Sequence, residues 1–214
     1  NDILFDETQV EQGRNFSNKI WNAFRLVKGW TVADVPQCPE HRVAVDWFRA
    51  RLAQTAAQMN RDYENFRIND AVMGVYKCFW DDFCSWYLEL VKPAFVEGVQ
   101  QPLDKATFDA TLSFFDALLK MLHPVMPFIT EELWHALEER EEGQTIMFQQ
   151  MPLGGACDEK LIADFAAACE VVVAVRALRQ AKGITEAAVL RLPSMPTTSS
   201  CSAATSAART LVTA

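Results

Sequence analysis

Residues 13–25 read GRNFSNKIWNAFR, and the apolar side chains of this stretch recur at the spacing of an α-helix. On a helical wheel they form one stripe, which consists of Phe16, Ile20, Phe24 and Val27. Such a stripe packs against a hydrophobic core. The sequence therefore predicts a helix over residues 8–29, with Gly29 as its C-terminal stop.

The opposite side of this helix is polar and cationic. It carries Arg14, Asn18, Asn22 and Arg25. Cations match phosphate oxygens and side-chain amides match base edges, so this face is suited to RNA. The alternative is a solvated helix face that binds nothing. Trp30 follows in a polar, Pro-rich stretch, where its ring is a candidate for base stacking, at about 1–3 kcal/mol per base; the alternative is a position in the core.

Similar periodicity predicts helices along most of the chain. With the first, they are expected at residues 8–29, 43–65, 69–92 and 104–122, from Thr130 onward, and at residues 159–181. The expected N-caps are Asn69 or Asp70, Asp104 and Thr130. We therefore predict a mainly α protein, in which five helices form a bundle and a small mixed α/β appendage follows at the C-terminus.

Three segments are expected. Residues 1–142 form the helical bundle. Residues 143–192 form the appendage, in which short strands at 145–148 and 190–192 flank a linker and the sixth helix. Residues 193–214 are a low-complexity tail of Ser, Thr and Ala without apolar periodicity.

The composition excludes several classes of protein. Half of the 214 residues are hydrophobic, so the chain can bury a sizeable core. A net charge of -8 argues against nonspecific binding of nucleic acid over the whole surface, so any RNA contact must be local. No apolar run approaches the roughly 20 residues of a membrane span, and no signal peptide is recognisable, so we expect a cytoplasmic protein without membrane contact. The first residue is not Met, and we expect a piece of a longer protein.

Candidate catalytic and metal sites are sparse. Glu132 and His135 have the Glu-x-x-His spacing of di-iron bundles, but those bundles use two such motifs, and the alternative is an ordinary helix start. Asp81, Asp82 and Glu89 fit a solvated surface better than an acid and base pair. The six cysteines are scattered without a Cys-x-x-Cys pair, and no phosphate loop or nucleophile motif is present. We therefore predict no catalytic residue and no metal ligand in this chain.

Three phrases carry a resemblance to a known family. They are residues 13–22, GRNFSNKIWN; residues 82–90, DFCSWYLEL; and residues 122–134, LHPVMPFITEELW. Together they resemble the valyl-tRNA synthetases, which are class I aminoacyl-tRNA synthetases, in the helical region that follows the catalytic core. The third phrase is shared with isoleucyl and leucyl relatives, whereas the first two point to the valyl branch. The resemblance covers about residues 1–185.

This resemblance implies an anticodon-binding module of a valine-tRNA ligase, which positions tRNA(Val) for ATP-dependent aminoacylation by a catalytic domain that this chain lacks. The family's catalytic signatures, His-Ile-Gly-His and Lys-Met-Ser-Lys-Ser, do not occur here. The residues that it places near the anticodon loop are Arg14, Asn18, Lys19, Asn22 and Trp30; the helix face adds Arg25. The fragment is expected to hold no cofactor, since ATP and Mg²⁺ belong to the parent enzyme. The implied partners are the anticodon stem-loop and the catalytic and editing domains of the same chain, in a monomer.

The end of the chain departs from that family. Members continue into further strands and a coiled coil, whereas this sequence turns into Ser, Thr and Ala. A truncation, or a change of reading frame near Ala187, would explain the difference; an uninterrupted native frame in the source gene would remove that hypothesis. The rival interpretation of the whole chain is a helical protein-interaction module that never touches RNA.

Overall fold

The computed structural model describes residues 6–183. The helices are α1 (Glu7–Lys28), α2 (Pro39–Glu64), α3 (Ile68–Lys77), the π-helix η1 (Cys78–Tyr87), α4 (Leu88–Val91), α5 (Lys105–Leu122), α6 (Pro127–Leu137), the 3-10 helix η2 (Ile146–Phe148) and α7 (Glu159–Ala181). The strands are β1 (Val32–Ala33), β2 (Phe95–Val96), β3 (Val99–Gln100) and β4 (Leu103–Asp104). Within this described part, none of the helices combines the length and the apolarity that a membrane crossing needs.

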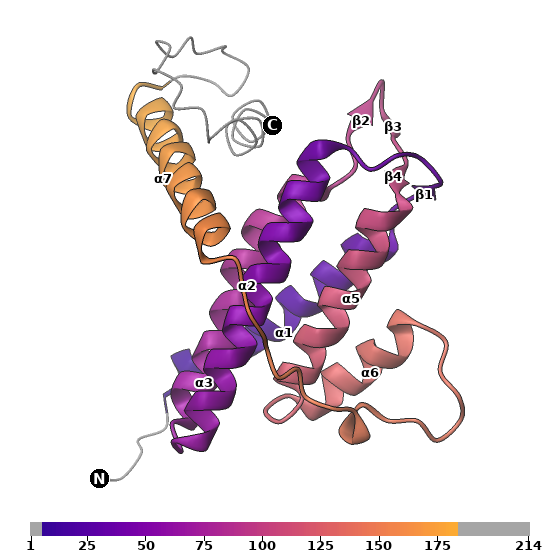
Figure 1. The fold of residues 1–214 in the computed structure, drawn as a ribbon, viewed down its shortest axis with the longest axis vertical. Helices are drawn as coiled ribbons and strands as arrows, with labels where there is room; N and C mark the ends of the chain where they lie inside the picture. Colours follow the sequence, from indigo (N-terminus) through magenta and orange to yellow (C-terminus); the bar gives the residue numbers. More distant parts are fainter. Residues whose placement is uncertain (1–5, 184–214) are drawn as a thin grey trace.

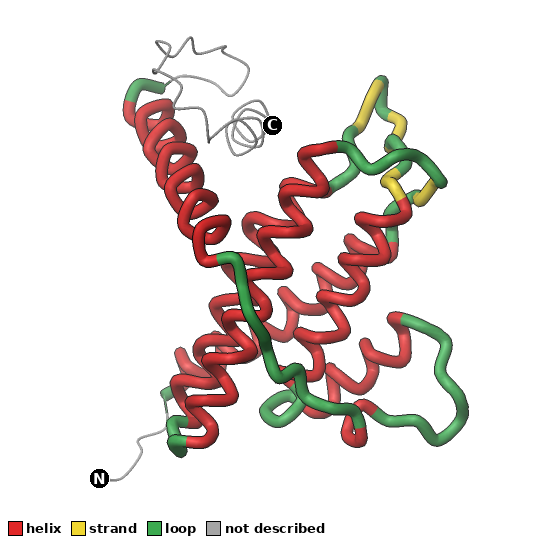
Figure 2. The backbone as a smooth tube through the Cα atoms, in the orientation of Figure 1, coloured by secondary structure: helices red, strands yellow, loops and turns green. Residues whose placement is uncertain are grey.

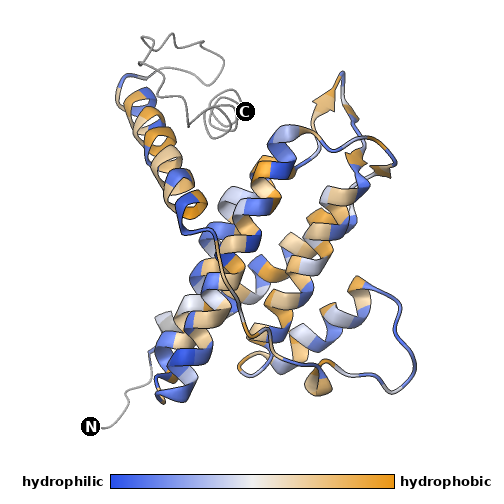
Figure 3. Ribbon diagram, in the orientation of Figure 1, coloured by the Kyte–Doolittle hydropathy of each residue, from blue (hydrophilic) through white to orange (hydrophobic). Residues whose placement is uncertain are grey.

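The predicted helical bundle is confirmed. α2 packs against α3 and α5, α5 packs against α6, and α1 lies behind them in Figure 1. Aromatic rings dominate the core, because Phe48, Phe79, Phe83 and Phe115 are all 0% exposed. The ring centroids of Phe83 in η1 and Phe115 in α5 lie 5.6 Å apart in an edge-to-face arrangement, so the two helices pack through this aromatic pair. Figure 3 shows hydrophobic residues along much of α5, as this central position requires.

Capping side chains explain where several helices begin. The carboxylate of Asp6 accepts a hydrogen bond from the Thr8 amide (2.9 Å) at the start of α1. Asp104, the predicted cap of α5, accepts from the Thr107 amide at 2.7 Å, which confirms that prediction. α2 begins four residues earlier than predicted, because Pro39 suits the first helical position and Cys38 precedes it as the N-cap.

The third predicted helix is continuous and consists of three consecutive segments, α3, η1 and α4. Neither Asn69 nor Asp70 caps it, since α3 begins at Ile68 and its N-cap residue Arg67 makes no side-chain capping bond. The middle piece has π-helical hydrogen bonds, which are rare over a whole segment and often occur near functional sites. A helical wheel does not separate this geometry from an ordinary α-helix.

Two further local predictions are wrong. Thr130 is not the cap of α6, which begins at Pro127; the Thr130 hydroxyl donates instead to the Met126 carbonyl at 2.8 Å, within the first turn. The strand predicted at residues 145–148 is the single turn η2, because Thr145 caps it by accepting from the Met147 amide at 3.2 Å.

The strands lie where the sequence predicted none, at one end of the bundle in Figure 2. β1 pairs with β4 in parallel, with Val32 opposite Leu103. β2 and β3 form an antiparallel hairpin, whose turn residues Glu97 and Gly98 both have positive φ angles. The β1–β4 pair ties the chain after α1 to the start of α5.

The chain after η2 crosses α2 in an extended strap and then forms α7 (Figure 1). Phe165 of α7 stacks on Trp47 of α2, with 3.8 Å between the ring centroids and an interplanar angle of 19°. The expected boundary at residue 142 is thus followed by a segment that packs on the bundle through this aromatic pair. The predicted strand at 190–192 and the tail at 193–214 lie outside the described residues.

Candidate nucleic-acid interface

α1 divides into a buried and an exposed face, as its sequence predicted. Phe16, Ile20 and Val27 are at most 5% exposed, and Phe24 is 9% exposed. With this stripe turned inward, the opposite side of the helix faces solvent. The residues of that polar face, namely Arg14, Asn18, Asn22 and Arg25, are all exposed.

The cations of this face are available to an anion. The Arg14 side chain is 68% exposed, and its Nη2 lies 3.5 Å from Oε1 of Glu11, which is also exposed. Ion pairs of this kind contribute little, typically about 0–1 kcal/mol. A phosphate could therefore displace Glu11 at low cost. The exposure of the polar face is confirmed, while its contact with RNA stays a prediction.

Lys19 lies at the edge of the face and already has an aromatic partner. Its Nζ is 5.4 Å from the ring centroid of Trp80 in η1. Trp80 in turn stacks on Tyr76, with centroids 5.8 Å apart and an interplanar angle of 20°. A cation over an aromatic face is attracted by the ring quadrupole. Lys19 therefore joins α1 to η1, and it is less free than Arg14 to meet a phosphate.

Trp30 is not the exposed ring that we expected. It is 7% exposed and belongs to the core. The cause is the strand pairing that follows, since the Leu103 amide donates to the Thr31 carbonyl at 2.8 Å and draws this segment onto the bundle. Its ring offers no open face on which a base could stack.

Trp21 is the aromatic residue that the sequence analysis missed. Its side chain is 42% exposed, and it follows Asn18 by three residues and precedes Arg25 by four, so it borders the polar face. Its ring centroid lies 6.2 Å from that of Phe24, which supports it from the core side. The spacing to Arg25 indicated this position, but Trp21 was not among the predicted site residues.

The far end of α1 is fastened to α6. Lys28 donates from Nζ to the carbonyl oxygen of Leu137, the last residue of α6, at 3.2 Å. That bond satisfies a carbonyl that the helix end leaves without an intrahelical partner. Lys28 is therefore a structural cation, and the polar face ends near this junction.

The enzyme-like candidates have structural partners. His135 Nε2 lies 3.0 Å from Oε1 of Glu131, not beside Glu132, and the Thr145 hydroxyl donates to the other oxygen of Glu131 at 2.8 Å. No group of three or more possible metal ligands occurs among residues 6–183. The structure therefore brings Glu131, His135 and Thr145 together and uses them to hold η2 on α6.

Two of the acidic candidates, Asp82 in η1 and Glu89 in α4, are paired as well. Burial raises the pKa of Asp82, although the guanidinium of Arg51, whose Nε lies 2.8 Å from the carboxylate, opposes that rise. Glu89 pairs with Lys92 at 2.6 Å on the surface. The carboxylates of Asp82 and Glu89 are therefore each held in an ion pair.

Comparison with known proteins agrees with the helical fold. Residues 46–192 match the family described as the anticodon-binding domain of tRNA ligase. The valine–tRNA ligase of Phocaeicola vulgatus is 52% identical over 192 residues, which are 90% of this chain and 22% of that protein. Those of Parabacteroides distasonis and Thermosynechococcus vestitus are 54% and 35% identical, over 90% and 84% of this chain. The chain spans about a fifth of the length of these relatives. It belongs to the family of tRNA ligase anticodon-binding domains.

Proposed function

We propose that this chain is the anticodon-binding module of a valine–tRNA ligase and that α1 holds the anticodon stem-loop of tRNA(Val). The observation that carries the proposal is the exposed polar face of α1, with two arginines, two asparagines and Trp21 at its border. The ligase relatives support the partner, since all three are valine–tRNA ligases. The matched family region begins at residue 46, so the role of α1 rests on its own geometry.

The side chains of the polar face of α1 would have different roles in binding RNA. Arg14 and Arg25 would hold phosphates, and Asn18 and Asn22 would meet the edges of unstacked loop bases. Trp21 takes the stacking role that Trp30 cannot fill in this structure. Lys19 would add charge at the margin while it stays on Trp80.

The rest of the reaction belongs to other parts of the parent chain. Activation of valine, with ATP and Mg²⁺, and editing would take place in domains that correspond to the remaining four fifths of the relatives. We assign the module to the cytoplasm and to a monomeric parent enzyme. The contribution of this chain is recognition and positioning of the tRNA.

The test is fluorescence anisotropy of the chain with a labelled valine anticodon stem-loop and a scrambled-loop control, across a salt series. Arg14→Ala should weaken binding about tenfold, the effect of losing one charge-assisted phosphate contact, and should reduce the salt slope by about one. Arg49→Ala is the matched control, because Arg49 is 59% exposed on α2 and also pairs with an acid three residues earlier. It should leave binding unchanged.

Trp21 is tested in the same assay. Trp21→Ala should cost about 1–3 kcal/mol of binding free energy, and Trp21→Phe should recover most of it because a ring remains. Equal affinity for the valine stem-loop and the scrambled-loop control would mean that the polar face of α1 binds phosphates without reading bases. Equal affinity of the Arg14 and Arg49 variants would remove α1 from the interface.

A further inference from the structure

A second surface of the molecule exposes large apolar side chains. At the end where α6 meets η2, Phe128 is 90% exposed, Phe148 is 81% exposed and Met147 is 67% exposed. Phe128 and Met147 line one hollow of about 380 Å³, together with Pro127 and His123. Single exposed apolar residues are ordinary, but a group around a hollow indicates an interaction site. We call this group the α6–η2 surface.

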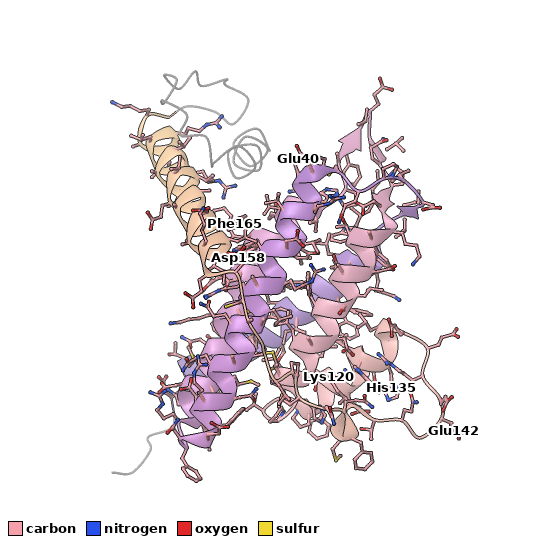
Figure 4. The ribbon with its side chains drawn as sticks, in the orientation of Figure 1. Glu40, Lys120, His135, Glu142, Asp158 and Phe165 are labelled. Atoms are coloured by element: carbon pink, nitrogen blue, oxygen red, sulfur yellow. The ribbon has the colours of Figure 1, made fainter. Side chains whose placement is uncertain are left out.

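The α6–η2 surface is also acidic. Glu131 and Glu132 line the hollow, and Glu139, Glu141 and Glu142 are exposed on the loop that follows α6. Figure 3 shows this loop as hydrophilic, and Figure 4 places Glu142 on it beyond His135. The negative charge disfavours phosphate, so this surface does not suit RNA.

The one arginine of that loop does not offset its charge. Arg140 turns inward, with its Cζ 3.9 Å from the ring centroid of Trp134 and its side chain 18% exposed. Its Nη2 also lies 3.4 Å from Glu138, so it neutralises that carboxylate and no other on the loop. The outward charge therefore comes from Glu139, Glu141 and Glu142.

We propose that the α6–η2 surface docks a segment of the parent ligase chain that carries Lys or Arg side chains around an apolar tip. The proposal rests on the proposed function, because it needs a parent chain of the length of the relatives. Apolar side chains of that segment fill the hollow between Phe128 and Met147, and its cations meet the exposed glutamates. Four fifths of the relatives lie outside the matched region, which supplies ample chain for this contact.

The location of the surface fits such a partner. The bond from Lys28 to the Leu137 carbonyl joins the end of α1 to the end of α6. The polar face of α1 therefore ends beside the acidic loop that follows Leu137, whereas the hollow lies toward the opposite, N-terminal end of α6. A segment that fills the hollow need not cover the polar face of α1, since the two are at different ends of α6.

The test measures the oxidation of Met147 by dilute hydrogen peroxide, which converts exposed methionine to its sulfoxide. The isolated chain is compared with the Phocaeicola vulgatus ligase in which this chain replaces the 192 matching residues. Met73, which is 42% exposed on α3, is the internal control. In the chimera Met147 should be oxidised about tenfold more slowly, which corresponds to about 1.4 kcal/mol of docking free energy, while Met73 should react at the same rate in both proteins.

Variants separate the apolar from the charged part of the contact. Phe128→Ser with Phe148→Ser should restore the oxidation of Met147 in the chimera, whereas Phe95→Ser, at a 69% exposed site on the hairpin, should not. Reversal of Glu139, Glu141 and Glu142 to Lys should also restore it. Protection that survives the charge reversal would overturn the proposed basic partner.

The outcomes keep this inference apart from the proposed function. A chimera that binds the anticodon stem-loop but oxidises Met147 as fast as the isolated chain would overturn the docking and leave the function intact. Protection of Met147 in a chimera that does not bind the anticodon stem-loop would overturn the proposed function and leave the docking intact. Protection of Met147 that grows with the concentration of the isolated chain would identify a second copy as the occupant, and would also overturn the proposal.

Discussion

Gly154 should be the glycine least tolerant of substitution in the strap that crosses α2. It has a φ angle of +74°, and a Cβ added there would lie 2.4 Å from the amide nitrogen of Ala57 and 2.6 Å from the carbonyl oxygen of Ala53. Both are helix backbone atoms, which cannot move aside as a flexible side chain could. The left-handed conformation costs alanine about 1–2 kcal/mol, and overpacking adds about 1–3 kcal/mol.

The strap has one way to escape this clash, which limits the cost. It can lift off α2, and then Asn60 loses its hydrogen bonds to the carbonyls of Pro152 (3.2 Å) and Leu153 (3.0 Å). Two such bonds are together worth about 1–3 kcal/mol. Because the chain takes the cheaper route, we expect Gly154→Ala to lower the free energy of unfolding by about 2 kcal/mol.

The neighbouring glycine provides the matched control. A Cβ on Gly155 would meet nothing within 4 Å. Gly155→Ala should therefore change the stability by less than about 0.5 kcal/mol. Urea denaturation of the wild type and both variants, followed by far-ultraviolet circular dichroism, measures the difference. If Gly154→Ala unfolds at the same urea concentration as Gly155→Ala, the strap does not lie against α2 as described.

Two further predictions concern buried polar groups. Burial alone would raise the pKa of Asp104, but hydrogen bonds from His41 and Thr107 outweigh it and hold this pKa below its ordinary value. The Asp104 carboxylate therefore stabilises the fold fully above its unfolded pKa of about 4, and this contribution is lost as the pH falls through the lower folded pKa. Asp104→Asn should flatten the fall of the urea midpoint below about pH 4; an unchanged slope would refute this. Tyr87→Phe should cost about 1 kcal/mol in urea titration, because the buried Tyr87 hydroxyl lies 2.8 Å from Oγ1 of Thr111; a variant as stable as the wild type would show that this bond adds nothing.

Local patterns predicted the parts of the fold that depend on local physics. The stripe from Phe16 to Val27 showed both the length of α1 and its two faces, because helical periodicity alone decides which side chains share a side. Asp104 was recognised as a cap because its carboxylate satisfies an amide within three residues. The exposed positions of Arg14 and Asn22 followed from the same wheel.

The errors came from contacts between distant segments. Trp30 is buried because β1 pairs with β4, about 70 residues later, and nothing in the polar stretch around it indicates that pairing. Thr145 begins a turn and not a strand because Glu131 of α6 binds its hydroxyl at 2.8 Å. Trp21 was not among the predicted site residues, although its spacing to Arg25 places it at the exposed border. Single-sequence patterns carry no information on such pairings.

The charge distribution explains how a chain with a net charge of -8 could still hold RNA at one face. Exposed charges act over about 8 Å at physiological ionic strength, so a phosphate responds to the nearest side chains and not to the total. On α1 it would meet Arg14 and Arg25, whereas beyond the Lys28 to Leu137 junction it would meet Glu139, Glu141 and Glu142 of the loop that follows α6. An RNA backbone laid across the molecule is then attracted on one side of that junction and repelled on the other. The acidic surface would thus limit the orientations in which a stem-loop can sit, which leaves the asparagines and Trp21 to act on bases presented in one direction.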